Sequence, residues 1–322
     1  MTRCFRPLLL APLALAPLLL MPGAARACSS CGCTLSTGWD SQGFATSAGF
    51  QVDLRYDYLN QSQLRSGTGS VDRDDYPLPQ DFELEKGTIN RYTTLGIDYS
   101  SGNDWGVNVA LPYIERDHST YPEGDTELAK SHSSSFGDAR VLVRWLGFTP
   151  EHDVGIQFGL KLPTGSHDVR FASGPEAGEP LDRGLQPGSG TTDLLLGAYR
   201  FGPMGQNWDY FVQGLAEVAL GSSDGFRPGP ALNLNAGVRY VANARVVPEL
   251  QLNGRVSRRD TGIEADTGNS GGTLVDLSPG VTVEVTDKLH LFGYVQLPLY
   301  QRVNGFQLAP RYTTSIGARY DF

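Results

Sequence analysis

The sequence contains few charged residues and few cysteines. Charged residues make up 19 % of the chain, and the formal net charge of −9 argues against nucleic acid as a partner, because nucleic-acid-binding surfaces are basic. Three of the four cysteines lie between residues 28 and 33, and none follows. The body of the chain therefore has no disulfide to close it, and packing and hydrogen bonds must hold it together.

Long apolar runs are also absent, apart from one near the N-terminus. Residues 8–21 are apolar but broken by prolines; they follow Arg3 and Arg6 and precede the small–x–small stretch Ala25–Ala27. This pattern predicts a cleaved secretory signal peptide over residues 1–27 rather than a membrane-spanning helix. No other stretch is apolar for long enough to form such a helix, so insertion into a membrane would require a β-barrel.

What the chain does contain is alternation of apolar and polar residues with a period of two, which is typical of strands with one apolar face. The alternation recurs often enough to predict an all-β fold of about twelve strands. The predicted strands are residues 44–58, 88–99, 105–113, 139–145, 154–162, 191–201, 208–218, 232–240, 250–256, 275–285, 289–297 and 306–322.

The connections between these segments alternate between long and short. Long polar stretches such as residues 60–85, 115–135 and 163–189 alternate with turns such as residues 286–288. Bacterial outer-membrane barrels have an even number of strands, long loops outside the cell and short periplasmic turns. The pattern therefore predicts a transmembrane antiparallel up-and-down β-barrel over residues 44–322, in the bacterial outer membrane, with both termini in the periplasm.

Aromatic residues favour the same orientation. Trp105, Trp145 and Trp208 all fall at the predicted periplasmic ends of their strands, as an interfacial aromatic belt requires. The last strand ends on Phe322, two residues after Tyr320, and this ending resembles the C-terminal signature of bacterial outer-membrane barrels. The resemblance implies that Tyr320 and Phe322 are a signal read by the barrel-assembly machinery, and that outer-membrane lipid surrounds the protein.

Two stretches in the middle of the chain carry a more specific resemblance. Residues 160–166 read Leu-Lys-Leu-Pro-Thr-Gly-Ser, and residues 188–194 read Gly-Ser-Gly-Thr-Thr-Asp-Leu. This pairing resembles the outer-membrane family named for the meta-pathway of phenol degradation, and it implies a protein associated with aromatic or other hydrophobic compounds. Taken as residues alone, the stretches predict a strand–loop–strand corner, since Pro163 cannot continue a ladder and the glycines permit sharp turns.

Three cysteines, Cys28, Cys31 and Cys33, form the sharpest chemical motif of the sequence, in a predicted periplasmic segment over residues 28–43. Thiolates at this spacing can converge on a soft metal ion such as Cu(I) or Zn(II). The alternatives are a disulfide between Cys28 and one of the other two, and lipidation of Cys28 as the first mature residue. No histidine follows the Cys-x-x-Cys, so haem attachment is not predicted, and no other cofactor is indicated.

Charged residues of both signs fall on the polar faces of the predicted strands. They predict a polar channel whose charges select solutes, or alternatively an internally salt-bridged interior that does not conduct. The predicted pore-lining residues are Asp53, Arg55, Asp98, Arg140, Arg144, Lys161, Glu217, Glu249, Arg255, Arg311 and Arg319.

Catalysis is not predicted, because four of the five histidines fall in predicted loops or turns and no serine accompanies His290 in a catalytic motif. The sequence predicts an outer-membrane channel or transporter for small solutes, hydrophobic or aromatic ones among them. The alternative prediction is a barrel that anchors the segment with Cys28, Cys31 and Cys33, as a metal-binding or redox module, to a periplasmic partner.

Overall fold

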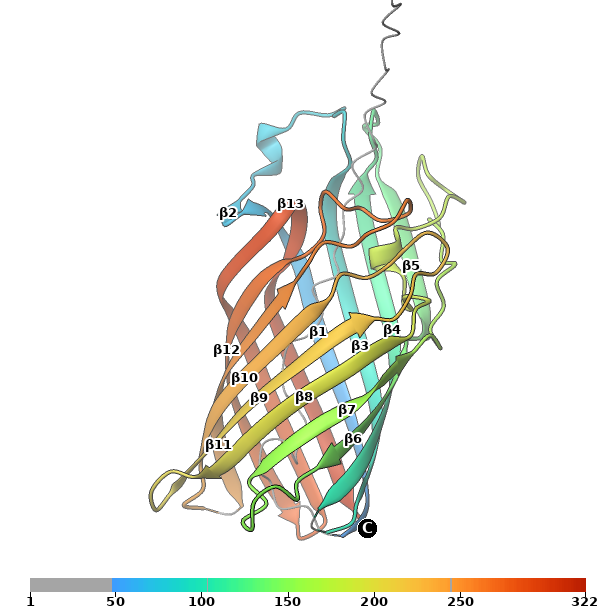
Figure 1. Ribbon diagram of the computed structural model, residues 1–322. Coiled ribbons are helices and arrows are strands. Elements are labelled where there is room, and N and C mark those ends of the chain that lie inside the picture. Colours follow the sequence, from blue (N-terminus) through green and yellow to red (C-terminus); the bar gives the residue numbers. More distant parts are fainter. Residues whose placement is uncertain (1–47, 103, 244) are drawn as a thin grey trace, which may run out of the picture.

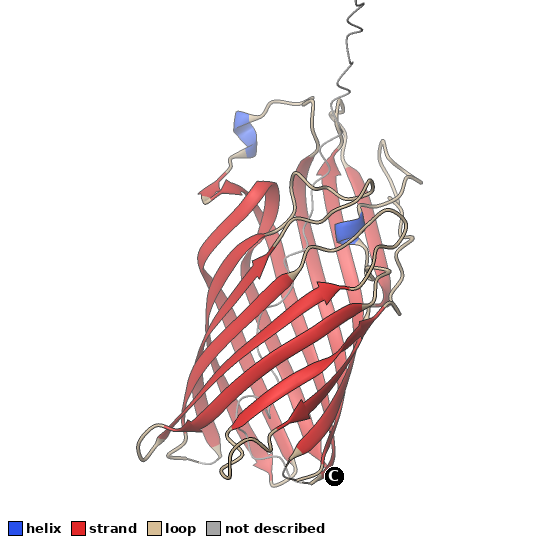
Figure 2. Ribbon diagram, viewed as in Figure 1, coloured by secondary structure: helices blue, strands red, loops and turns tan. Residues whose placement is uncertain are grey.

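The computed structural model describes residues 48–322 except 103 and 244. The predicted signal peptide, the cysteine cluster and the predicted start of the barrel at residue 44 lie outside the described residues. Within them, the regular structure is antiparallel β-sheet with two single-turn 3-10 helices (Figure 2). No helix in this part of the chain is long and apolar enough to cross a membrane.

One sheet contains all of the described strands, and it closes on itself (Figure 1). Eleven strands form the ring because β13 pairs with both β12 and β1, whereas β2 and β5 lie outside it, paired with β1 and β4. The strands are β1 (Gly49–Gly67), β2 (Gly69–Ser70), β3 (Leu84–Ser100), β4 (Trp105–Tyr121), β5 (Ala129–Phe136), β6 (Ala139–Trp145), β7 (Val154–Leu162), β8 (Asp193–Pro203), β9 (Trp208–Ala219), β10 (Ala231–Tyr240), β11 (Val246–Ser257), β12 (Gly272–Thr286) and β13 (Leu289–Asp321), and the 3-10 helices are η1 (Arg73–Asp75) and η2 (Arg183–Leu185).

The last strand, β13, contributes two antiparallel segments to the barrel wall. Residues 289–303 pair with β12 and residues 303–321 pair with β1, and the chain reverses next to Gly305, which has a φ of +60°. Both pairings are antiparallel, and only an even number of crossings can close an antiparallel ring. Because β13 counts twice, the eleven ring strands provide twelve antiparallel segments around the barrel. This confirms the predicted closed antiparallel barrel of about twelve strands.

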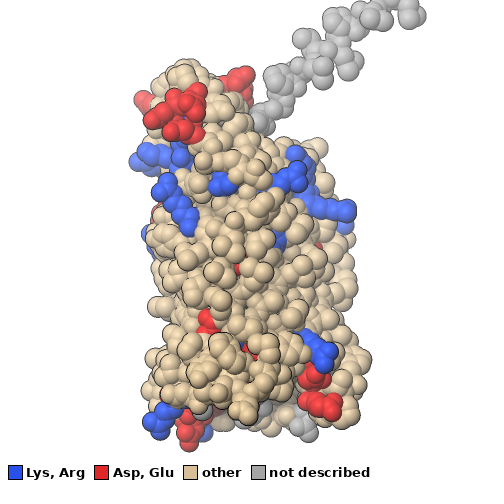
Figure 3. Space-filling view, turned by 90° about the vertical axis from the view of Figure 1, so that its left-hand side faces the viewer, with Lys and Arg blue, Asp and Glu red and all other residues tan. Residues whose placement is uncertain are grey.

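The alternation along each strand separates an apolar outer face from a polar inner face. On β11, Leu250 and Leu252 are 43 % and 47 % exposed, whereas the alternating residues Gln251 and Asn253 are fully buried. A soluble sheet buries residues in the opposite sense, so the inversion is that of a barrel whose outer face contacts lipid. On the face that Figure 3 shows, charged side chains gather toward the two ends, and the band between them is nearly free of charge.

Aromatic side chains mark both edges of this apolar band. At the end that holds the C-terminus, which we call the C-terminal rim, the ring of Tyr99 lies 5.4 Å from that of Trp105. Trp105 is also the register partner of Trp145. At the opposite end, where the longer loops gather (Figure 2) and which we call the loop rim, the ring of Tyr113 lies 5.3 Å from that of Phe136. The two belts bound the part of the wall that would span a membrane.

Two segments predicted as loops are β-strand in part. The predicted loop over residues 115–135 contains the end of β4 and most of β5, and the predicted loop over residues 60–85 begins with the last residues of β1. These extensions lie beyond the apolar band, and their outer face is polar. The carboxylate of Asp117 there lies 2.7 Å from both Arg91 and His132. Hydrophobic alternation cannot reveal a strand whose outer face is polar, which explains the error.

Candidate functional site

The inner face of the barrel carries ten of the eleven residues predicted to line a pore. Arg311 is exposed instead, at a point where the register of β1 against β13 shifts between Asn60 opposite Tyr312 and Gln61 opposite Pro310. The extra residue of such a bulge leaves the face that its neighbours share. The role of the other ten in lining a conducting pore stays a prediction.

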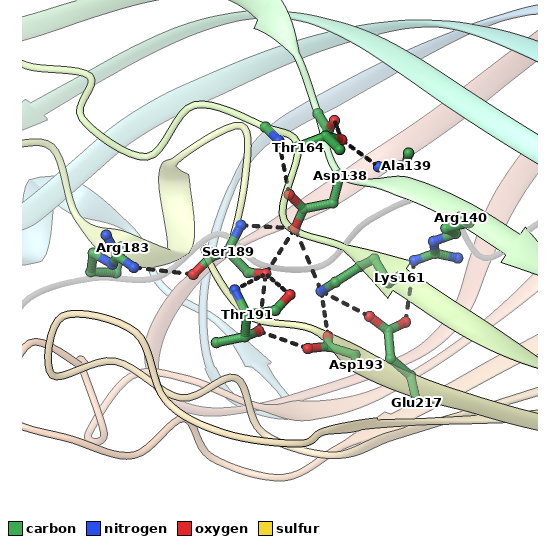
Figure 4. A network of polar contacts seen from close by, with 12 residues as sticks. Asp138, Ala139, Arg140, Lys161, Thr164, Arg183, Ser189, Thr191, Asp193 and Glu217 are labelled. Atoms are coloured by element: carbon green, nitrogen blue, oxygen red, sulfur yellow. Dashed lines mark hydrogen bonds and ion pairs between the residues drawn. The ribbon is translucent and has the colours of Figure 1, made fainter.

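Lys161 of β7 stands at the centre of an ionic cluster on this inner face (Figure 4). Its Nζ contacts Asp193 of β8 directly, and lies 3.1 Å from Glu217 Oε1 and 3.8 Å from Asp138 Oδ2. A second cation, Arg140 of β6, lies with its Nη2 3.2 Å from Glu217 Oε2. Two cations thus meet three carboxylates, and the cluster carries a formal excess of one negative charge. We call these five residues the Lys161 cluster.

The strand register explains why these charges meet. Lys161 is the register partner of Arg140 on one side and of Asp193 on the other, so all three point inward from adjacent strands. Side chains opposite each other on one face of a sheet are close enough to interact directly. Lys161 and Asp193 are almost completely buried, and the partners around them offset the cost of removing their charges from water.

Asp138, just before β6, ties the Lys161 cluster to the loop between β7 and β8. Its carboxylate accepts hydrogen bonds from the backbone N–H of Gly165 (3.1 Å), and from the N–H (2.9 Å) and Oγ (2.8 Å) of Ser189. The backbones cross closely here, since a Cβ on Gly188 would lie 2.4 Å from the carbonyl oxygen of Gly165. Both stretches that carry the family resemblance therefore meet in one corner, as their turn residues predict.

Asp193 is a member of the cluster to which sequence reasoning gave no role. It appears there only as a letter of the Gly-Ser-Gly-Thr-Thr-Asp stretch, whereas in the structure it contacts Lys161 and accepts a 2.7 Å hydrogen bond from Thr191 Oγ1. The signal that could have found it is a carboxylate at the start of one predicted strand and a lysine at the end of the preceding one. Antiparallel neighbours place such positions opposite each other.

A second buried ion pair lies nearer the C-terminal rim. Arg144 of β6 reaches across β4 and donates from Nη1 and Nη2 to the two carboxylate oxygens of Asp98 on β3, at 2.6 and 2.8 Å. Gly106 of β4 makes this reach feasible, because a Cβ there would lie 2.2 Å from the guanidinium carbon of Arg144. Bidentate pairing of this kind is the strong, geometrically specific form of a salt bridge.

The inner face also presents aromatic rings, each lying against a glycine of an adjacent strand segment. A Cβ on each of these glycines would approach the ring to within 2.0–2.3 Å, so the ring occupies the space of the missing side chain. The pairs are Tyr199 with Gly155, Phe211 with Gly237, Tyr294 with Gly280 and Phe292 with Gly317. The interior therefore combines charged clusters with buried aromatic rings.

The loop after β7 packs against the inner face at the loop rim. Its residues Phe171, Leu181 and Leu185 form a buried cluster with Ala129 of β5. Arg116 of β4 fixes the loop further, since its guanidinium donates to the carbonyl of Leu185. The loop thus covers part of the inner wall at this end of the barrel.

No family model matches this chain, and no curated protein matches it in sequence. Among solved structures, the COG4313 outer membrane channel from Pseudomonas putida F1 is similar with a TM-score of 0.63, at 14 % identity, over 89 % of this chain and 100 % of that one. Two further structures are less similar, each with a TM-score of 0.46 at 10 % identity over 86 % of this chain. They are the CymD monoaromatic hydrocarbon channel, of which 89 % is covered, and the Ralstonia pickettii toluene transporter TbuX, of which 90 % is covered. The fold is that of outer-membrane β-barrel channels.

Proposed function

We propose that this protein is an outer-membrane channel that passes small solutes through the interior of its barrel. The observation that carries the proposal is the inverted polarity of a closed wall, with exposed leucines and valines outside and buried charged and amide side chains inside. Such a wall is stable only when hydrocarbon surrounds it and polar groups or solutes meet its inner face. The family resemblance of residues 160–166 and 188–194 supports the same function.

The proposed orientation places the C-terminal rim in the periplasm and the loop rim outside the cell, because short turns face the periplasm in bacterial barrels. Phe322 fits the proposed role of an assembly signal. Its backbone N–H donates to the Phe50 carbonyl at 3.1 Å, whereas its side chain is 68 % exposed and packs against the ring of Tyr320. The two rings are therefore held at the rim by the backbone, where the assembly machinery can reach them.

The family resemblance also indicates the class of solute. Residues 160–166 and 188–194 resemble a family associated with aromatic or other hydrophobic compounds. The rings of Tyr199, Phe211, Phe292 and Tyr294 are at most 7 % exposed and pack against the wall, so the resemblance carries this part of the proposal. We therefore propose that hydrophobic or aromatic solutes are among those that the channel passes.

Replacing Lys161 by Met is expected to make the channel more selective for cations. The substitution removes one of the two cations of the Lys161 cluster and leaves its three carboxylates. A unit charge that acts through water on an ion several ångströms away is worth about 0.5–1 kcal/mol, so the cation-to-anion permeability ratio should rise about two- to fivefold. The measurement is the reversal potential of the purified protein in a planar bilayer under a KCl gradient.

The matched control for this experiment is Lys130→Met. Lys130 is an exposed lysine of β5, whose alternation places it on the outer face, so its removal should leave the reversal potential unchanged. If Lys161→Met and Lys130→Met give the same permeability ratio as the unaltered protein, ions do not pass the Lys161 cluster, and the proposed path through the barrel is wrong.

A further inference from the structure

A concave, basic site lies at the loop rim where β11, β12 and β13 end. It encloses about 500 Å³, and its lining includes Arg258, Arg259, Arg302, Thr273 and Asn304. All three arginines are exposed, and within the described residues none forms a salt bridge with a carboxylate. This is unlike the outer face of β3 and β4, where Asp117 neutralises Arg91. Arg259 donates to the carbonyls of Thr267 and Gly268, whereas no such contact in the described part of the chain holds Arg258 or Arg302. The site therefore presents positive charge that no carboxylate pairs.

The register places this site directly above the apolar band. Leu252, Leu277 and Leu297 form one outward row across β11, β12 and β13. Two rows closer to the loop rim, the partners across the same strands are Val256, Thr273 and Arg302, and Arg258 follows Val256 two residues later. The outward side chains thus change from leucine and valine to arginine within a few residues along these strands. In Figure 3, Lys and Arg side chains gather above the uncharged band on the face that holds β12 and β13.

We propose that this site binds the phosphate group of a membrane lipid whose acyl chains lie along the apolar rows below it. Guanidinium groups are suited to phosphate because their planar N–H donors match its oxygens in pairs, and basic pockets at the level of the headgroups bind anionic lipids. A lipid fits better than a free anion because the site opens on the outer wall immediately above side chains such as Tyr300 and Leu297, which are 45 % exposed. The phosphate group would contact the arginines, and the acyl chains would contact the apolar side chains below them.

The proposal rests on the proposed orientation of the loop rim toward the outer leaflet, but it does not require that the barrel conducts. In that leaflet, the lipid of this chemistry is a phosphorylated glycolipid. A lipid-binding measurement on the protein in detergent therefore separates the two proposals, since binding can fail while conductance is retained, and the reverse.

The experiment is native mass spectrometry of the detergent-solubilised full-length protein with bisphosphorylated lipid A. We expect an adduct of one lipid whose apparent affinity falls at least about tenfold in the Arg258→Gln/Arg302→Gln variant, because two charge-assisted contacts are lost. Lipid A with its phosphates removed should bind at least tenfold more weakly to the unaltered protein. Arg258→Lys/Arg302→Lys, which keeps the charge, should retain part of the affinity.

Arg245→Gln is the matched control, because Arg245 is an exposed arginine in the turn between β10 and β11 at the other rim. It should bind lipid A like the unaltered protein, and heat-dependent gel mobility shows that every variant is a folded barrel. Unchanged affinity in Arg258→Gln/Arg302→Gln would overturn the proposal, as would equal binding of the lipid without phosphates. Displacement of the lipid by equimolar inorganic phosphate would assign the site to a free anion and overturn it too.

Discussion

Replacing Asp98 by Ala is expected to destabilise the barrel by about 3–5 kcal/mol, because it removes the carboxylate that neutralises the buried guanidinium of Arg144. The side chains of both residues are at most 5 % exposed, and two hydrogen bonds of 2.6 and 2.8 Å join them. Asn108 adds a weaker hydrogen bond of 3.3 Å to the same carboxylate. The measurement is the free energy of unfolding from a reversible denaturant titration in lipid vesicles or detergent.

The double variant Asp98→Ala/Arg144→Met distinguishes the effect of losing the charge pair from the effect of losing side-chain volume. The double variant removes the buried cation together with its carboxylate, and an apolar side chain of similar length replaces the guanidinium. We expect most of the lost stability to return. If the free energy of unfolding of the single variant Asp98→Ala lies within about 1 kcal/mol of that of the unaltered protein, water reaches Arg144 and the pair is not buried.

Replacing Val109 by Arg is expected to cost about 2–4 kcal/mol if the residue lies near the middle of the membrane. Val109 is 38 % exposed on the outer face of β4, with Ile97 of β3 and Val141 of β6 as its register partners. An arginine there would place its charge among lipid chains. Val143→Arg on β6 should behave in the same way, and the free energy of unfolding in phospholipid vesicles measures both.

The neighbouring residue Asn108 provides the internal control. Its side chain is on the inner face and donates to Asp98 at 3.3 Å, so an arginine there would meet the carboxylate of Asp98 rather than lipid. Asn108→Arg should cost less than about 1 kcal/mol. Equal costs at Val109 and Asn108 would show that the two faces of β4 do not meet different surroundings.

The fold is predictable from this sequence because a membrane imposes its own pattern on every strand that crosses it. Leucine and glutamine alternate along β11 because one face meets lipid and the other faces the interior, and that alternation is visible in the sequence. The same logic placed Trp105, Trp145 and Trp208 at one rim. Beyond the apolar band the constraint ends, and there the predicted loop over residues 115–135 is wrong.

The candidate site is predictable only in part. Alternation is sufficient to place Lys161 and Glu217 inside the barrel, but not to show that they share one cluster, because that depends on the register of β7, β8 and β9. Arg311 shows the same limit, since it is the extra residue of a bulge and is exposed, although the sequence alternates regularly around it. The assignment of Asp193 requires knowing which strands are neighbours.

The central claim is that small solutes cross the membrane through the interior of this barrel, and solute uptake by proteoliposomes tests it most directly. Liposomes containing the purified, folded protein should take up a small aromatic acid faster than a disaccharide, should exclude a dextran of several kilodaltons, and should exceed protein-free liposomes for both small solutes. Uptake of both small solutes at the protein-free rate, with the protein shown to be folded and inserted, would contradict the claim.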